Sequence, residues 1–186
     1  MRRLQIVAAV AFAFIASAAV AQDDPKNAIK LNFLSPIVQT LNLSYERTTG
    51  PSQSFQLGFY YTGAKSRDVK LRGFGITPEY RFYLGEEKPA PDGFYIAPFL
   101  RYTKYDLTSE ADQDQQTSRG TYTSFGGGFV VGRQWVFKKR ATFDMFIGPK
   151  MQSRNVTTNS GNDDDFNIGL FGRFGLRAGV TVGLAF

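Results

Sequence analysis

The sequence predicts an all-β protein, an eight-stranded antiparallel up-and-down transmembrane β-barrel that follows a removable signal peptide. Three observations predict this fold class. Apolar and polar residues alternate with a period of two through most of the chain, which is the pattern of β-strands. No segment after the N-terminal one has the ~18 consecutive apolar residues of a membrane-spanning helix. Long polar connections alternate with shorter ones, as in outer-membrane barrels, where every second connection lies at the same end.

The first residues have the three parts of a secretory signal peptide. Arg2 and Arg3 supply the positive charge, residues 6–15 are almost continuously apolar, and Ala19-Val20-Ala21 is a small-residue cleavage site. The alternative is an N-terminal membrane anchor, but the apolar run is short for a spanning helix of about 20 residues. We expect a signal peptide, a short N-terminal extension and the barrel, at residues 1–21, 22–26 and 27–186.

The composition argues against most enzymatic chemistry. The chain has no cysteine and no histidine, so it lacks cysteine nucleophiles, histidine bases and the usual nitrogen and sulfur ligands of zinc. The net charge falls from +6 to +4 when Arg2 and Arg3 are removed, and no block of basic residues indicates nucleic-acid binding. We therefore expect no enzymatic activity, no cofactor, no metal site and no nucleic-acid partner.

Eight segments alternate, and we expect each to form one strand. The clearest is the last, where every second residue from Ile168 to Phe186 is apolar or glycine while the positions between hold mainly glycines, a threonine and two arginines. Segment 121–137 is the weakest, because Arg133 interrupts its apolar face. The expected strands are residues 27–34, 39–46, 54–61, 71–84, 94–105, 121–137, 142–154 and 168–186.

Two features of the strand pattern leave alternatives open. Only Ser35-Pro36 separates the first two segments, so they form either two strands or one bent strand. Pro78, Pro98 and Pro149 fall inside expected strands, where proline cannot donate a ladder hydrogen bond. We expect local bulges at these three prolines.

The connections predict which end of the barrel faces outward. The shorter ones lie at residues 35–36, 48–51, 85–93 and 138–140. The three longest polar, proline-free ones lie near residues 62–70, 106–120 and 155–166. These three are every second connection, so we expect them on the outside, with the shorter turns and both termini in the periplasm.

The alternation leaves two ways to orient the wall. A soluble barrel that binds an apolar ligand places its apolar face inside, whereas a membrane barrel places it outside. The second face mixes small residues with charges of both signs, which suits a narrow lumen where opposite charges pair. We expect a structural charge network in the lumen, formed by Lys30, Glu46, Glu79, Arg81, Arg101, Asp144, Lys150, Arg173 and Arg177.

Few other residues are candidates for chemistry or binding. Glu79 and Asp144 are the best acid pair, but salt bridges to the lumen arginines account for them. Residues 162–165 offer oxygen ligands without the spacing of a calcium loop, so we expect a solvated loop there. Aromatic side chains near the turn ends of strands are typical of a membrane interface. These are Tyr45, Phe82, Trp135 and Phe137.

Several stretches together resemble a known family. They are Asn27-Ala28-Ile29-Lys30-Leu31-Asn32, Leu43-Ser44-Tyr45-Glu46-Arg47, Gly75-Ile76-Thr77-Pro78-Glu79-Tyr80-Arg81-Phe82-Tyr83, Gly93-Phe94-Tyr95-Ile96-Ala97-Pro98, and the last strand ending in Phe186. On these residues the chain resembles the small outer-membrane β-barrels of unknown function that are common in Bacteroidetes. The resemblance implies a fold and an outer-membrane location, but no defined activity. Phe186 resembles the C-terminal signal that the outer-membrane insertion machinery binds, although Thr181 departs from that signal.

These observations lead to one expected function and two alternatives. We expect an outer-membrane barrel with a structural or surface-interaction role, in contact with outer-membrane lipid and presenting its long loops to a surface ligand. The alternatives are a narrow ion-conducting channel and a soluble periplasmic barrel that binds an apolar ligand. An eight-stranded barrel is too narrow for a solute pore.

Overall fold

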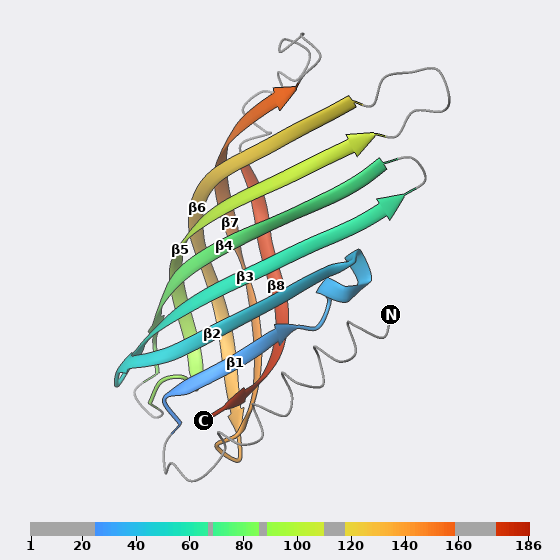
Figure 1. The fold of residues 1–186 in the computed structure, drawn as a ribbon. Coiled ribbons are helices and arrows are strands. Elements are labelled where there is room, and N and C mark those ends of the chain that lie inside the picture. Colours follow the sequence, from blue (N-terminus) through green and yellow to red (C-terminus); the bar gives the residue numbers. More distant parts are fainter. Residues whose placement is uncertain (1–24, 67–68, 86–88, 110–117, 159–173) are drawn as a thin grey trace, which may run out of the picture.

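The computed structural model describes residues 25–66, 69–85, 89–109, 118–158 and 174–186. Within them, eight strands pair in chain order, and β1 pairs with β8 to close an antiparallel barrel (Figure 1). The strands are β1 (Asn27–Asn32), β2 (Thr40–Gly50), β3 (Gln53–Ser66), β4 (Val69–Tyr83), β5 (Gly93–Ser109), β6 (Ser118–Phe137), β7 (Ala141–Thr158) and β8 (Phe174–Ala185). The predicted fold class is confirmed, whereas the signal peptide lies outside the described residues.

The first two segments form two separate strands. A 3₁₀ helix, η1 (Ser35–Val38), lies between them, and Gln39 follows in the left-handed region with a φ of 53°. This reversal turns the chain so that β1 pairs antiparallel with β2, from Asn27 opposite Arg47 to Leu31 opposite Leu43. Pro36 favours the turn, because a proline cannot extend the ladder of a central strand.

One predicted loop is wrong, because most of residues 62–70 belongs to paired strands. β3 and β4 stay in register from Gln53 opposite Phe82 to Ser66 opposite Val69. The same extension occurs in β5, β6 and β7, which reach Ser109, Ser118 and Thr158. The polar composition of these segments predicts loops. Polar residues are, however, equally suited to strands that extend beyond the apolar part of the barrel wall. The remaining parts of the two other long loops lie mainly outside the described residues.

The prolines do not produce the predicted bulges. Pro78 and Pro98 lie where the β4–β5 ladder is interrupted, and Pro149 lies at a gap in the β6–β7 ladder. Each ladder resumes after its gap in the same register. Each proline therefore removes hydrogen bonds from the ladder because it lacks an N–H, but the strand contains no extra residue at that point and so forms no bulge. In the described strands, the one register shift is between Thr48 and Gly50, in β2.

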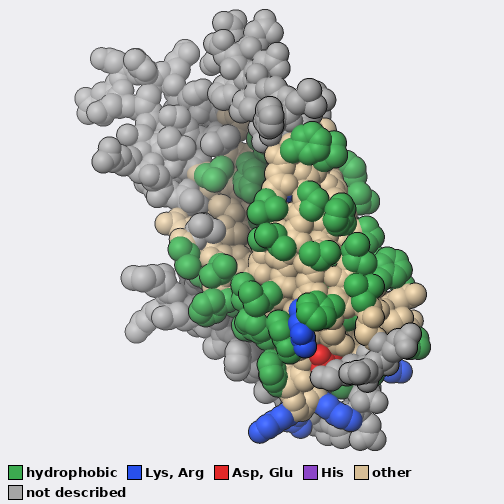
Figure 2. Space-filling view, turned by 180° about the vertical axis from the view of Figure 1, so that it is seen from behind, with side chains coloured by type: hydrophobic (Ala, Val, Ile, Leu, Met, Phe, Trp, Pro, Cys, Tyr) green, Lys and Arg blue, Asp and Glu red, His purple; other side chains and the backbone are tan. Residues whose placement is uncertain are grey.

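The wall of the barrel is apolar outside and polar inside. Large hydrophobic side chains are exposed on every strand, including Phe59, Ile76, Leu100 and Ile147. Figure 2 shows such side chains spread over one face of the wall, with Lys and Arg side chains at its lower end. The alternate positions are buried and carry polar or charged groups, among them Lys30. No helix in the described residues is long and apolar enough to cross a membrane.

The end that carries the termini has short connections. Phe137 and Ala141 are paired, and the Arg140 N–H donates to the Phe137 carbonyl at 3.0 Å. Lys138 and Lys139 have φ angles of 48° and 58°, as the two central residues of a type I′ hairpin turn require. This turn matches the tight connection predicted at residues 138–140.

Candidate functional site

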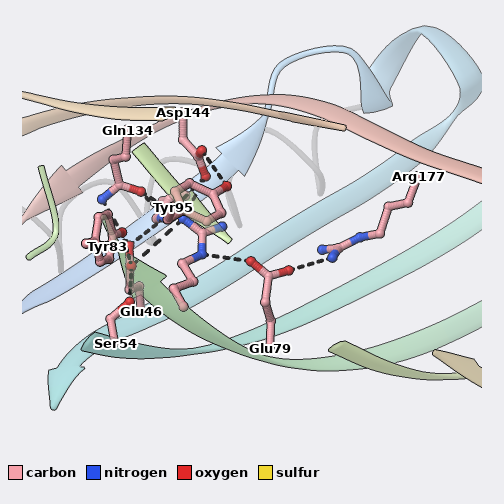
Figure 3. Close-up of polar contacts among 10 residues, drawn as sticks. Glu46, Ser54, Glu79, Tyr83, Tyr95, Gln134, Asp144 and Arg177 are labelled. Carbon is pink, nitrogen blue, oxygen red and sulfur yellow. Dashed lines mark hydrogen bonds and ion pairs between the residues drawn. The ribbon is translucent and has the colours of Figure 1, made fainter. Parts of the chain in front are cut away.

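The lower half of the lumen, toward the termini, contains a network of buried charged side chains (Figure 3). Among the described residues, its carboxylates are Glu46 on β2, Glu79 on β4 and Asp144 on β7, and its cations are Lys30 on β1, Arg81 on β4 and Arg177 on β8. Each of these side chains points into the lumen because successive residues of a strand point to opposite faces of the wall, and a residue next to it in the sequence is apolar and points outward. The formal charges of the six side chains therefore balance.

Glu46 is the first centre of the network and interacts with five groups, one of which is Arg81, whose Nη1 lies 3.8 Å from Glu46 Oε1. Its Oε2 lies 2.5 Å from Lys30 Nζ and accepts a hydrogen bond from Gln134 Nε2 at 3.0 Å. Its Oε1 accepts hydrogen bonds from Ser54 Oγ at 2.5 Å and from the Tyr83 hydroxyl at 2.7 Å. Neutral hydroxyl and amide donors thus complete the hydrogen bonding of a buried carboxylate that also pairs with two cations, Lys30 and Arg81.

Asp144 is the second centre. Arg81 Nη1 lies 2.9 Å from its Oδ2, and the Tyr95 hydroxyl donates to its Oδ1 at 2.8 Å. Lys30 Nζ is 3.5 Å from the same Oδ2, so Lys30 connects Asp144 with Glu46. The Arg81 guanidinium carbon lies 4.2 Å from the centre of the Tyr95 ring, which adds a cation–π contact.

Glu79 links the network to the middle of the barrel. Its Oε1 accepts a hydrogen bond from Arg81 Nε at 2.7 Å, and its Oε2 accepts one from Arg177 Nη1 at 2.5 Å. The Arg177 guanidinium carbon also lies 4.3 Å from the ring centre of Phe99 and 4.8 Å from that of Phe146. The network therefore ends against an apolar layer.

That apolar layer is a feature that the charge pattern did not predict. Tyr83, Tyr95, Phe99 and Val130 are buried inside the barrel as one cluster, with Phe146 packed against it. Tyr95 and Phe99 have the same parity in the sequence as Arg101, which was expected in the lumen, and this parity is the sequence signal for the cluster. In an eight-stranded barrel such side chains fill the interior.

Gln134 is one of the polar network residues that sequence reasoning missed, together with Ser54, Tyr83 and Tyr95. Its Oε1 accepts hydrogen bonds from Lys30 Nζ at 2.5 Å and Arg81 Nη1 at 3.0 Å, while its amide nitrogen donates to Glu46. It lies on β6, the segment in which Arg133 obscured the alternation. Arg133 is outward-facing, with its guanidinium carbon 4.5 Å from the Phe94 ring centre and 5.0 Å from that of Trp135.

Two of the residues expected in the network lie elsewhere in the lumen, and a third cannot be placed among the described residues. Arg101 and Lys150 line a separate cavity of about 270 Å³ in the upper lumen, on the side away from the termini. Arg173 lies outside the described residues. Tyr60, Tyr105 and Tyr122 line the same cavity, and its remaining six lining residues have neutral hydroxyl or amide side chains.

The geometry offers little for catalysis in the described part of the chain. Glu79 and Asp144 are each held by arginines, so neither is an available acid or base. The described residues contain no group of three or more metal-ligating side chains of the His, Cys, Asp and Glu types. Phe186 lies next to Asn27, and backbone hydrogen bonds of 2.8 and 2.9 Å join the two residues and close the barrel.

The remaining predicted residues are the aromatic side chains at the turn ends. Tyr45, Phe82 and Phe137 are exposed on the outer wall, and Trp135 is partly exposed. The Tyr45 hydroxyl donates to Asn27 Oδ1 at 2.7 Å, and the rings of Trp135 and Phe143 are 5.6 Å apart. The outer surface near the termini is thus rich in aromatic rings, of which those of Tyr45 and Trp135 also carry a polar group.

Comparisons with known proteins found one family and solved β-barrel structures to which this chain is similar. A family model described as a protein of unknown function, DUF3575, matches residues 6–153. The N-terminal β-barrel domain of Pseudomonas aeruginosa OprF is 12% identical, with a TM-score of 0.45, and 89% of this chain and 100% of that one are covered. A major outer membrane protein from Thermus thermophilus is 12% identical, with a TM-score of 0.46 and coverage of 86% and 97%. No curated protein matches the chain.

Proposed function

We propose, for a chain that belongs to the DUF3575 family of proteins of unknown function, that its barrel spans the outer membrane and has a structural or surface-interaction role. The observation that carries the proposal is the inverted wall. Large apolar side chains are exposed outside on all eight strands, while three carboxylates and three cations are paired inside. Lipid is the surrounding in which such an apolar outer surface is stable.

The height of the apolar band supports a membrane span. On β4, β5 and β7, the outward residues are all apolar over stretches of nine residues, at 74–82, 94–102 and 143–151. A tilted transmembrane strand needs about 9–11 residues to cross the hydrocarbon core. The next outward residues toward the upper end are Arg72, Lys104 and Ser153. The band therefore ends where the strands begin to project beyond it.

The projecting parts of the strands are the proposed interaction surface. β5, β6 and β7 have 17, 20 and 18 residues, which is longer than a span requires. Together with the β3–β4 hairpin, they form a polar extension at the end away from the termini. This extension would present residues to a ligand outside the cell.

The two alternative functions find no support in the described residues. A conducting channel requires an open path, but the paired charges and the Tyr83, Tyr95, Phe99 and Val130 cluster occupy the lower lumen. A soluble barrel for an apolar ligand requires an apolar interior. The cavity of about 270 Å³ instead has cationic, tyrosine and neutral polar lining.

The orientation can be tested by cysteine labelling, because the chain has no native cysteine. Asp106 is exposed above the apolar band and Arg140 is exposed in the turn near the termini. We expect Asp106→Cys to react with a polyethylene glycol maleimide on intact cells. Arg140→Cys should react only after the outer membrane is permeabilised. Equal labelling of both variants on intact cells, or the reverse pattern, would contradict the proposed topology.

A further inference from the structure

The upper-lumen cavity differs in charge from the network below it. Among the described residues, the network balances three carboxylates with three cations, whereas the cavity lining contains Arg101 and Lys150 and no carboxylate. Its other nine lining residues are three tyrosines and six residues with neutral hydroxyl or amide groups. Positive charge surrounded by neutral donors and acceptors favours an anion that also carries hydroxyl groups.

Arg101 is the residue on which this chemistry depends. In the described part of the chain, its side chain has one hydrogen bond, from Nε to Thr77 Oγ1 at 3.0 Å, and no ion pair. Lys30, Arg81 and Arg177, by contrast, each have a carboxylate oxygen within 2.7 Å. The bond to Thr77 fixes the inner edge of the guanidinium, which leaves its terminal nitrogens for the fork-like contact that arginine makes with carboxylates and phosphates.

Three tyrosines form a fixed wall beside Arg101. The Tyr60 hydroxyl donates to Thr103 Oγ1 at 2.9 Å and lies 3.1 Å from the Tyr105 hydroxyl. The rings of Tyr60 and Tyr105 are 6.3 Å apart, and those of Tyr105 and Tyr122 are 6.1 Å apart. The Arg101 guanidinium carbon is 5.4 Å from the Tyr60 ring centre. The wall is therefore preorganised before any ligand arrives.

Glycines on β4 make room for this wall. A Cβ atom at Gly75 would lie 2.2 Å from Tyr60 Cε1, and one at Gly73 would lie 2.1 Å from Tyr105 Cδ1. Any side chain at these two positions would push the tyrosine rings away from β4. The glycines thus allow both rings to stand in the lumen beside the cavity.

We propose that this cavity binds a small hydroxylated oxyanion of monosaccharide size, such as a sugar acid or a sugar phosphate. The oxyanion contacts the terminal nitrogens of Arg101, the ring packs against Tyr105 and Tyr122, and the hydroxyl groups bond to neutral residues such as Thr103 and Ser124. The volume of about 270 Å³ is that of a small ligand, just below the range of about 300–1,000 Å³ that is common for small-molecule sites. Binding follows from the fold and does not depend on which side of the membrane the cavity faces.

Isothermal titration calorimetry tests the proposal on the full mature barrel, purified from outer membranes in a zwitterionic detergent. The probes are glucuronate and glucose 6-phosphate, and glucose is the uncharged control. We expect either or both charged sugars to bind while glucose does not. Binding of glucuronate alone assigns a carboxylate ligand, and binding of glucose 6-phosphate alone assigns a phosphate ligand. Absence of binding of both charged probes, or equal binding of glucose, would overturn the proposal.

Matched arginine variants locate the site. Arg101→Gln should weaken binding of the charged sugar by about 10- to 100-fold, because it removes a charge-assisted hydrogen bond. Arg133→Gln removes the same charge from the outer wall and should leave the affinity unchanged. A folded Arg101→Gln protein with the affinity of the native barrel would refute the assignment.

A steric variant keeps the test valid if Arg101→Gln does not fold. Ser124 is buried and lines the cavity, so Ser124→Tyr fills the space without changing the charge. We expect this variant to abolish binding while it retains the native barrel mobility on an unboiled gel. Retained affinity in folded Ser124→Tyr would place any bound sugar elsewhere and reject the cavity.

Discussion

Asp144 shows, at the scale of single residues, why the interior of this barrel accommodates charge. Its carboxylate is fully buried, and it is bonded to Arg81 and Tyr95 and lies 3.5 Å from Lys30. A buried ion pair is costly to form, but the removal of one partner is costlier, because the other charge remains in the interior without compensation. The balance of three carboxylates and three cations is therefore a condition of the fold.

We expect Asp144→Asn to lower the free energy of unfolding by about 3–5 kcal/mol, since it leaves Arg81 and Lys30 with one carboxylate fewer. Urea unfolding of the barrel in lipid bicelles measures this change. Asp106→Asn is the matched control, because Asp106 is exposed and bonded only to Thr121 among the described residues. Equal stabilities of the two variants would show that the network is not required for stability.

Gly75 carries a second prediction at this scale. Gly75→Ala should destabilise the barrel by about 1–3 kcal/mol, the usual cost of overpacking, because the new Cβ would overlap the Tyr60 ring. Gly63→Ala is the control, since a Cβ there would meet Tyr61 at an ordinary 3.5 Å. Thermal unfolding followed by gel mobility compares the two. A Gly75→Ala barrel as stable as the Gly63→Ala barrel would mean that the tyrosine wall is not tightly packed.

Arg133 explains why one strand was difficult to predict. Its charge interrupts the apolar face of segment 121–137, yet it lies on the outer wall between the rings of Phe94 and Trp135. Arginine can cover aromatic faces with its stem and plane while its charged group reaches the membrane interface. Arg133 can therefore lie on the outward face of β6, and its charge does not indicate that the alternation of that strand changes.

At the scale of elements, local alternation predicted the faces of the strands better than their ends. A period of two depends on neighbouring residues alone, so the inward and outward sets were predictable for segments such as 71–84. The ends depend on pairing across the barrel, and polar residues 62–66 pair in β3 although they resemble a loop. The prolines likewise interrupt the ladders without bulges, because the strands on both sides of each gap retain their register.

The β3–β4 hairpin gives a prediction at this scale. Residue-resolved amide exchange, measured by NMR in detergent micelles, should show slow exchange for Thr62 and Gly63 on β3 and for Val69 and Lys70 on β4, which all lie in the segment expected to be a loop. Their positions in the paired ladder protect the hydrogen-bonded amides from solvent. Ser52, in the turn between β2 and β3, serves as the fast-exchanging reference. Exchange of all four strand amides as fast as that of Ser52 would restore the original interpretation of a loop.

At the scale of the whole molecule, parity in the sequence indicates which charges share a face of the wall but not how they are arranged across the lumen. Parity placed Lys30, Glu79 and Arg101 inside, whereas the distances across the lumen depend on the stagger of eight strands. The structure therefore separates Arg101 and Lys150, in the cavity, from the six network residues. Gln134 was missed because a neutral amide has no distinctive pattern in a sequence, although it bonds to Lys30, Arg81 and Glu46.

The central claim is that this barrel is stable in a membrane, with its apolar wall against lipid. The most direct measurement is the gel mobility of the protein in isolated outer membranes, with and without boiling in SDS. We predict that the unboiled protein is found in this fraction and migrates faster than the boiled protein, because a closed barrel of eight strands resists SDS. Recovery of a folded protein from the periplasmic extract without detergent would contradict the account.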